Sequence, residues 1–244
     1  MKLFGLIGDN LSRSRSVELF DKYVAPHNHN CEYRNFELTD IGELTELLAE
    51  WPDIEGFNVT APFKEDIMTY IDRLSETAAR VGAVNCVKVE HDHDGNFILH
   101  GHNTDIDGFL VGITPMLPYN PFTAIVLGTG GASKAVVEAL KTVTKNIVVV
   151  SRRPSEGVLT YADLKASMFE GEEVLVVNAT PVCPEDFPFG LLRPQDRAYD
   201  LNYAPAVTEF MSRAAQQGAT VANGLGMLLA QARLSWQIWG LKTD

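Results

Sequence analysis

The sequence predicts an α/β protein. Apolar runs of four to six residues alternate with longer segments of helical period, which is the pattern of parallel sheets covered by helices. A glycine-rich segment lies where one apolar run ends and a helical segment begins. The chain has 244 residues, 45% of them hydrophobic, and is therefore long enough for one large domain or two small ones, each with its own core.

Turn residues and apolar alternation divide the first half of the chain into short elements. We expect strands at residues 3–7, 31–38, 56–59, 84–89 and 97–100. The last two should pair across the turn-rich segment 92–96. Helical spacing predicts helices at residues 16–23, 41–49, 75–80 and 107–113. Three prolines between residues 114 and 122 should end the last of these helices, and we expect a domain boundary nearby.

The second half of the chain alternates strands and helices more regularly, with short connections. We expect strands at residues 123–127, 147–150, 174–178 and 198–201. We expect helices at residues 133–141, 161–169 and 207–217. The last segment, residues 226–239, places apolar side chains three and four residues apart, which predicts an amphipathic helix able to return to the first domain.

Composition excludes several classes of protein. Lys and Arg number 20 against 32 Asp and Glu, a formal charge of −12, which repels nucleic acid and anionic membranes. No apolar run approaches the roughly 18 residues that span a bilayer, and the run at residues 3–8 stops at Asp9, too short for a secretion signal. The three cysteines are far apart, which indicates neither a disulfide framework nor a metal site. We expect a cytoplasmic protein with no metal, no membrane and no nucleic-acid partner.

The glycine-rich segment has the form of a dinucleotide-binding turn. Gly128 permits a tight turn after the strand, Gly130 lets a pyrophosphate approach the backbone, and Ser133 is the third small residue. Thr129, Gly131 and Ala132 complete the segment. Because a strand precedes it and a helix follows, we favour dinucleotide binding over the alternative, an ordinary tight turn.

Ser151, Arg152 and Arg153 follow the next strand along the chain. An NAD site usually carries Asp or Glu here, about 20 residues after the glycine turn, to bind the ribose 2′-hydroxyl. Two guanidinium groups suit the 2′-phosphate of NADP instead, because Arg pairs with phosphate through two parallel hydrogen bonds. The alternative is that one or both arginines are solvated helix-cap residues. The sequence favours NADP over NAD.

Polar residues also follow an apolar strand in the first half of the chain. Asn58, Thr60 and Lys64 lie around a proline turn at a strand's carboxyl end, where open α/β sheets bind ligands. A lysine amine can donate and accept a proton in catalysis, and the alternative for Lys64 is an ordinary surface lysine. Two other polar segments, residues 14–16 and 103–105, equally well begin a helix when each is read in isolation.

These segments belong to an ordered set of motifs. In chain order the motifs are Ser14-x-Ser16, Asn58-Val59-Thr60-x-Pro62-Phe63-Lys64, Gly82-Ala83-Val84-Asn85, Asn103-Thr104-Asp105-x-x-Gly108, the glycine turn, Asn178-Ala179-Thr180, Asp200-Leu201-x-Tyr203 and Gly224-Leu225-Gly226-Met227-Leu228-x-x-Gln231. Over essentially the whole chain, from residue 6 to residue 240, the sequence resembles the shikimate dehydrogenase family.

The resemblance implies a catalytic pair, Lys64 and Asp105. The residues that it implies around the substrate's hydroxyls and carboxylate are Ser14, Ser16, Thr60, Lys64, Asn85, Asp105, Tyr203 and Gln231. The residues that it implies at the NADP site are Gly128, Thr129, Gly130, Gly131, Ala132, Ser133, Ser151, Arg152, Arg153, Asn178, Ala179, Thr180, Leu201, Gly224 and Met227. A small, anionic, hydroxyl-rich substrate suits many short hydrogen-bonding side chains rather than an apolar pocket.

The resemblance further implies two domains and a reaction. Residues 1–104, with the helix at 225–244 packing back on them, would form an N-terminal α/β substrate-binding domain, and residues 105–224 a Rossmann-like NADP-binding domain. The reaction would be the NADPH-dependent, reversible reduction of 3-dehydroshikimate to shikimate, in the pathway to chorismate and the aromatic amino acids. NADPH would supply the hydride and Lys64 the proton, while Asp105 orients both Lys64 and the substrate. A monomer or homodimer is expected.

Four positions depart from the family pattern. Val17 stands where proline is common, Cys86 replaces a threonine, Ser151 replaces an asparagine, and Pro181 stands where serine is usual. None of these changes removes a proposed catalytic group. We therefore expect them to affect ligand affinity more than chemistry.

Three alternative functions share much of this pattern. One is a quinate/shikimate dehydrogenase paralogue that oxidises quinate or another polyol acid, with NAD or NADP. The basic pair Arg152 and Arg153 argues against NAD but does not distinguish one ring substrate from another. Another is a non-catalytic NADP-binding regulatory module, against which the intact Lys64 and Asp105 argue. Methylene-tetrahydrofolate dehydrogenase shares the broad two-domain design but does not account for Gln231 or the segment 103–105.

Overall fold

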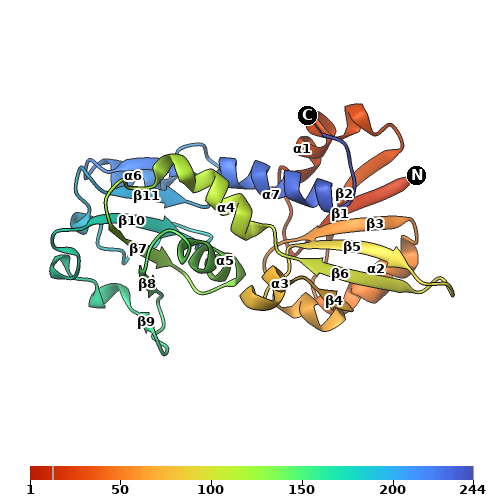
Figure 1. Ribbon diagram of the computed structural model, residues 1–244, viewed down its shortest axis with the longest axis horizontal. Helices are drawn as coiled ribbons and strands as arrows, with labels where there is room; N and C mark the ends of the chain where they lie inside the picture. Colours follow the sequence, from red (N-terminus) through yellow and green to blue (C-terminus); the bar gives the residue numbers. More distant parts are fainter. Residues whose placement is uncertain (13, 244) are drawn as a thin grey trace. The chain divides into compact units, whose positions relative to one another are not determined.

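The protein is described by a computed structural model that covers residues 1–12 and 14–243 (Figure 1). It separates into two compact units, one formed by Met1–Thr104 with Gln231–Asp244 and the other by Asp105–Ala230. The second boundary falls inside the last helix, α7 (Leu225–Ile238), six residues beyond the residue 224 at which we expected the domain to end. What each unit binds stays a prediction.

The first unit is built on a mixed sheet with the strand order β2-β1-β3-β5-β6-β4. Its strands are β1 (Lys2–Gly8), β2 (Cys31–Glu37), β3 (Ile54–Val59), β4 (Arg73–Leu74), β5 (Cys86–His91) and β6 (Phe97–His102). The strands β2, β1 and β3 are parallel, whereas β5 pairs antiparallel with both β3 and β6. The expected pairing across residues 92–96 is confirmed. This hairpin makes the sheet mixed rather than purely parallel.

Helices cover both faces of this sheet because successive strand residues point in opposite directions. Leu3 and Ile7 of β1 face a core that includes apolar residues of α2 (Leu44–Glu50) and α3 (Glu76–Val81). The helix α2 follows directly on a 3₁₀ turn, η2 (Ile41–Glu43). A second 3₁₀ turn, η3 (Asp66–Tyr70), leads into β4, and Ser75 is then the N-cap of α3.

The opposite face of the same sheet is aromatic. Phe4 of β1 lies against Phe20 of α1 (Ser16–Tyr23) and stacks on Trp239, with ring centroids 5.0 Å apart in the second pair. The Trp239 indole also donates a hydrogen bond of 2.9 Å to the Val87 carbonyl. A Cβ atom at Gly56 would collide with this indole, so the approach of the chain's end to β3 requires glycine there. The predicted return of the last helix to the first part of the chain is confirmed.

The second unit is built on a parallel sheet with the strand order β12-β11-β10-β7-β8-β9. Its strands are β7 (Phe122–Leu127), β8 (Asn146–Val150), β9 (Val158–Leu159), β10 (Glu173–Asn178), β11 (Arg197–Asp200) and β12 (Thr220–Asn223). Its helices are α4 (Asp105–Ile113), α5 (Gly131–Leu140), α6 (Glu209–Ala215) and the first part of α7, joined by short 3₁₀ turns such as η4 (Thr114–Met116) and η7 (Phe189–Leu191). The order reverses between β7 and β10, as in the doubly wound dinucleotide-binding sheet.

One predicted helix is wrong. The segment 161–169 forms two short 3₁₀ turns, η5 (Tyr161–Asp163) and η6 (Ala166–Phe169), rather than an α-helix. The side chains of Thr160 and Asp163 close the first turn as a capping box, and the backbone at Leu164 is extended (ψ 123°). Tyr161, Leu164 and Phe169 still reach the core of the second unit, so their burial produces helix-like spacing without a helix. The short strands β4, β9 and β12 were not predicted.

The remaining differences are shifts of element ends. The helix α4 begins at Asp105 rather than 107, α5 begins at Gly131 rather than 133, and α6 begins after the N-cap Thr208. Among the described residues, no helix is both long and apolar enough to cross a bilayer. Within that same part of the chain, no group of three or more His, Cys, Asp or Glu side chains is placed to hold a metal ion.

Candidate functional site

The carboxyl ends of the second sheet bring together most of the predicted cofactor residues. Strand register pairs Val150 with Leu127, Leu127 with Asn178, and Asn178 with Asp200. The residues that follow these strands and β12 therefore form one row, consisting of Ser151, Gly128, Ala179, Leu201 and Gly224. Backbone hydrogen bonds fix the row: Gly128 donates to Val150, Ala179 to Leu127, and Leu201 to Asn178, at 2.8–2.9 Å. Open α/β sheets bind ligands at this edge.

The glycine turn lies at the switch point of this sheet. Gly128 has φ +111°, a backbone conformation that favours glycine, and a Cβ there would press on Ala179 and Thr180. No atom lies within 4 Å of a Cβ built at Gly130, so the backbone there is open to a ligand. Ser133 is buried and donates a hydrogen bond of 2.6 Å to the Gly128 carbonyl, so its hydroxyl stabilises the turn from inside. The first N–H groups of α5 follow directly, as at known pyrophosphate sites.

The basic segment after β8 lies one strand away from the glycine turn. Ser151 is half-buried and donates its backbone N–H to the Leu159 carbonyl at 2.9 Å, whereas Arg152 and Arg153 are exposed. Neither Asp nor Glu stands at these positions. The donor set therefore suits a phosphate on the adenosine ribose better than a free 2′-hydroxyl.

A buried carboxylate holds the loops after β10 and β11. Asp200 accepts hydrogen bonds from Asn178 Nδ2 at 3.0 Å and Thr208 Oγ1 at 2.6 Å, and also from Asn202. Asn178 in turn accepts from the N–H and hydroxyl of Thr180. Burial raises the pKa of Asp200, and the hydrogen bonds oppose that rise. A network of side-chain hydrogen bonds centred on Asp200 thus fixes the Asn178-Ala179-Thr180 segment.

The turn from β12 into α7 carries the last two predicted cofactor residues. A Cβ at Gly224 would collide with the Leu201 carbonyl oxygen, so only glycine allows these two loops to approach each other. Met227 is buried, and its backbone lies close to Gly112 of α4. A Cβ built at Gly112 would be only 2.8 Å from the Met227 nitrogen. Tyr203, a predicted substrate residue of this unit, lies half-buried in the loop after β11.

In the first unit, predicted substrate residues lie at the carboxyl ends of β1 and β3. Thr60 follows β3 and donates its backbone N–H to Ile7 at 2.9 Å. Lys64 is half-buried, four residues further on beyond a cis Ala61–Pro62 bond, and its carbonyl accepts the Val84 N–H at 2.7 Å. The Ser14 hydroxyl accepts the backbone N–H of Ser16, the first residue of α1, at 3.2 Å.

Asn85 and Gln231 are brought together although 146 residues separate them. Asn85 is 2% exposed, and its Nδ2 donates to Thr104 Oγ1 at 2.9 Å and reaches Gln231 Oε1 at 3.4 Å. Its Oδ1 accepts the Thr104 backbone N–H at 2.7 Å. Thr104 immediately precedes Asp105, the first residue of α4, which is 3% exposed and belongs to the second unit.

Sequence reasoning missed several polar residues beside these. Asn58 and Thr104 belonged to motifs but received no role at the site, and Tyr33 and Ser235 were not considered. Asn58 is buried near the carboxyl end of the apolar strand β3, and Ser235 lies one helical turn after Gln231. A polar residue in an apolar strand, which must find buried partners, was the available signal for Asn58. No sequence signal marked Tyr33.

The four departures from the family pattern lie in different environments. Val17 is half-buried on α1, and Pro181 is exposed. Cys86 is fully buried, and its thiol interacts with the Ser235 hydroxyl, while burial raises its pKa to about 12. Cys86 thus keeps a weak hydrogen-bonding role where a threonine is usual.

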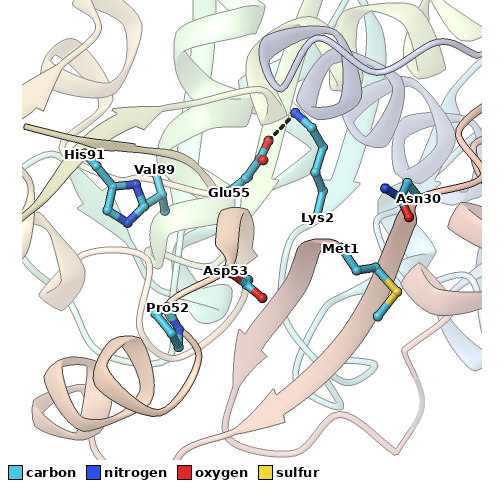
Figure 2. A pocket seen from close by; sticks show the side chains of 8 residues that line it. All are labelled: Met1, Lys2, Asn30, Pro52, Asp53, Glu55, Val89 and His91. Carbon is cyan, nitrogen blue, oxygen red and sulfur yellow. Dashed lines mark hydrogen bonds and ion pairs between the residues drawn. The ribbon is translucent and has the colours of Figure 1, made fainter. Parts of the chain in front are cut away.

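A surface pocket of the first unit lies at the other end of the sheet (Figure 2). It is lined by Met1, Lys2, Asn30, Pro52, Asp53, Glu55, Val89 and His91. Lys2 begins β1 and Asp53 precedes β3, so the pocket lies at the amino ends of the parallel strands. The Lys2 ammonium pairs with Glu55 at 2.6 Å, which raises the pKa of Lys2. None of the predicted site residues lines this pocket.

The strand order of the second sheet and its glycine turn define a protein of the Rossmann-like dinucleotide-binding class. Residues 6–87 match the family model described as the shikimate dehydrogenase substrate binding domain. The chain is 32% identical over 253 residues to shikimate dehydrogenase (NADP(+)) of Clostridium botulinum strain 657, covering 97% of this chain and 96% of the relative. The chain belongs to the shikimate dehydrogenase family.

Two solved structures show what relatives of this fold bind. Shikimate 5-dehydrogenase from Thermus thermophilus, in complex with NADP(H) and shikimate, is 30% identical with a TM-score of 0.82, and the match covers 100% of this chain and 95% of that one. Quinate dehydrogenase from Corynebacterium glutamicum, in complex with NAD, is 25% identical with the same TM-score and coverage.

Proposed function

We propose that this protein catalyses the NADPH-dependent, reversible reduction of 3-dehydroshikimate to shikimate. The observation that carries the proposal is the meeting of distant motif residues at one edge of the first sheet. Thr60 follows β3, Lys64 is tied through its backbone to Val84, and Asn85 contacts Gln231 from the far end of the chain. These residues supply the short polar side chains that a hydroxyl-rich substrate requires.

The residues of the second unit support NADP as the cofactor. The backbone at Gly130 is open, the first turn of α5 presents N–H groups for a pyrophosphate, and Arg152 and Arg153 are exposed beside the turn. Met227 and the segment Asn178–Thr180 would complete the site. When bound, NADPH supplies the hydride that reduces the ring ketone.

The catalytic roles follow from the chemistry of carbonyl reduction. Hydride addition to the carbonyl carbon leaves charge on its oxygen, which must receive a proton. We propose that the Lys64 ammonium donates this proton and accepts it again in the oxidative direction, with Asp105 as the second catalytic group. Ser14, Ser16, Thr60, Asn85, Tyr203 and Gln231 would bind the substrate's carboxylate and hydroxyls.

The three cysteines are all free, which fits action in the reducing cytoplasm. The protein would act as a monomer or homodimer without nucleic-acid or membrane partners. The relative that is a quinate dehydrogenase makes quinate with NAD the second candidate pair of ligands.

The test is an assay of nicotinamide reduction with shikimate and quinate, each offered with NADP and with NAD. We expect fast turnover with shikimate and NADP. In Lys64→Ala, kcat should fall at least ~100-fold, because general acid–base catalysis contributes that much, and KM should change far less. Lys88→Ala is the matched control, since Lys88 is a surface lysine of the same unit that pairs with Glu90.

Each contrary result has a specific meaning. Near-normal turnover in Lys64→Ala would make Lys64 a binding residue only. Preferred turnover of quinate would replace the proposed substrate. No turnover in all four pairings, together with measurable NADP binding, would support the non-catalytic regulatory module instead.

A further inference from the structure

A buried chain of hydrogen bonds runs through the first unit beside the proposed substrate residues. The Tyr33 hydroxyl donates to Asn58 Oδ1 at 3.0 Å. Asn58 Nδ2 donates to Ser235 Oγ at 2.8 Å and to the Asn85 carbonyl at 3.1 Å. All three side chains are buried: Tyr33 is 4% exposed, Asn58 7% and Ser235 0%. We call Tyr33, Asn58 and Ser235 the polar relay.

Both ends of the polar relay reach proposed substrate residues. At one end, Tyr33 on β2 interacts with the Ser16 hydroxyl of α1; burial raises the pKa of this phenol, and the hydrogen bond from Ser16 opposes the rise. At the other end, the Ser235 hydroxyl donates to the Gln231 carbonyl at 3.1 Å, one turn earlier on α7. The polar relay thus connects Ser16 to Gln231.

The central amide has its hydrogen-bonding groups occupied within the protein. A side-chain amide has two N–H donors, and those of Asn58 find acceptors on Ser235 and Asn85 while its oxygen accepts from Tyr33. A buried amide without partners would be costly, so these bonds fix its orientation. Asn58 in turn fixes the backbone of Asn85, whose side chain contacts Gln231.

We propose that Tyr33, Asn58 and Ser235 are positioning residues for the substrate, acting through Ser16, Asn85 and Gln231. They hold three segments distant in sequence, on α1, immediately before β5 and on α7, in the geometry that binds the substrate's polar groups. This inference rests on the proposed function, because Ser16, Asn85 and Gln231 are its substrate residues. The relay residues themselves need not touch the substrate.

Two substitutions isolate the hydroxyl groups from packing. Tyr33→Phe keeps the ring that packs on Phe20 with centroids 5.1 Å apart, and removes the hydroxyl that donates to Asn58 and interacts with Ser16. Ser235→Ala removes the acceptor for Asn58 Nδ2. Ser212→Ala is the control for Ser235, because Ser212 makes the same bond to the carbonyl four residues earlier, on α6. Tyr23→Phe on α1 is the control for Tyr33.

The experiment measures kcat and both KM values for each purified variant, with folding checked by thermal unfolding. We expect the KM for shikimate to rise about 5- to 10-fold in Tyr33→Phe and in Ser235→Ala, the factor typical of one lost hydrogen bond. The KM for NADP and the kcat should stay within about 2- to 3-fold of the wild-type values. A loss of folded protein alone would instead lower the apparent kcat and leave the KM for shikimate unchanged. The double variant should be no worse than the worse single one, because both act through Asn58.

Contrary outcomes are distinguishable. If the wild type turns over shikimate and both variants keep its KM within about 2-fold, the inference is wrong and the proposed function stands. Equal rises in the KM for shikimate and for NADP, or fully additive effects in the double variant, would also overturn the relay. A wild type that neither binds nor turns over shikimate overturns the proposed function, and the relay's role with it.

Discussion

At the scale of single residues, Glu173 shows how one carboxylate joins neighbouring strands. It is the first residue of β10, accepts a hydrogen bond from Asn120 Nδ2 at 2.7 Å and pairs with Arg197, the first residue of β11. The hydrogen bond from Asn120, and next that from Arg197, hold the pKa of Glu173 below its ordinary value. The folded protein therefore binds a proton at Glu173 less tightly than the unfolded chain does.

This lowered pKa predicts a pH-dependent contribution to stability. Because the folded pKa is below the unfolded one, the contribution is fully present above about pH 5 and is lost as the pH falls through the folded pKa. We expect Glu173→Gln to reduce the free energy of unfolding by ~1 kcal/mol at pH 7 and by much less near pH 3. Urea unfolding of both proteins at several pH values measures this. A difference that is constant with pH would contradict it.

At the scale of elements, the conformation of the turn between β12 and α7 depends on the close approach of Gly224 to Leu201. Gly224 donates its N–H to the Asn202 carbonyl at 3.3 Å and leaves no room for a Cβ beside Leu201. The helix that follows begins in the second unit and continues into the first, where Trp236 and Trp239 pack in the aromatic face. The conformation of this turn therefore sets where α7 begins.

Replacing the glycine at this turn should destabilise the second unit. We expect Gly224→Ala to reduce the free energy of unfolding by ~1–3 kcal/mol, the usual cost of overpacking, and to raise the KM for NADP several-fold. Gly190→Ala is the control, because no atom lies within 4 Å of a Cβ built there, and it should change stability by less than about 0.5 kcal/mol. Urea unfolding measures the stabilities. Equal stabilities of the two variants would show that Leu201 moves aside at little cost.

At the scale of the whole molecule, the proposed ligand contributes to stability. A ligand that binds only the folded state adds ~2.7 kcal/mol at 100 times its dissociation constant. The net charge of −12 makes binding of an anionic cofactor dependent on local positive groups. In the second unit, Arg152 and Arg153 are such groups beside the glycine turn.

The two arginines predict a difference between cofactors in thermal unfolding. At equal concentration, NADP should raise the melting temperature of the wild type more than NAD does. The advantage of NADP should disappear in the variant carrying Arg152→Ala and Arg153→Ala, because the 2′-phosphate loses its guanidinium partners. Arg73→Ala, on β4 of the first unit, is the control and should keep it. An unchanged advantage in the double variant would show that other groups bind the 2′-phosphate.

The sequence pattern correctly predicted those helices, strands and turns whose conformation depends on residues nearby in the chain. Strand β7, the glycine turn and α5 follow one another directly, so apolar runs, glycine spacing and helical period predicted them together. The helix predicted at residues 161–169 was wrong because burial of Tyr161, Leu164 and Phe169 is compatible with 3₁₀ turns as well as with an α-helix. Strand β12 was missed because it lies at the edge of the sheet and none of its residues is fully buried, so it carries little apolar pattern.

The sequence by itself determined the α/β class, the dinucleotide turn, the basic segment after β8 and the family, because these depend on residue types at short, regular spacing. Only the tertiary structure decided that Asn85 meets Gln231 and that Tyr33, Asn58 and Ser235 form one relay. Such contacts join residues up to 177 positions apart. They arise when the sheet registers and α7 bring those residues into the same buried volume. The spacing of residues along the chain therefore does not predict them.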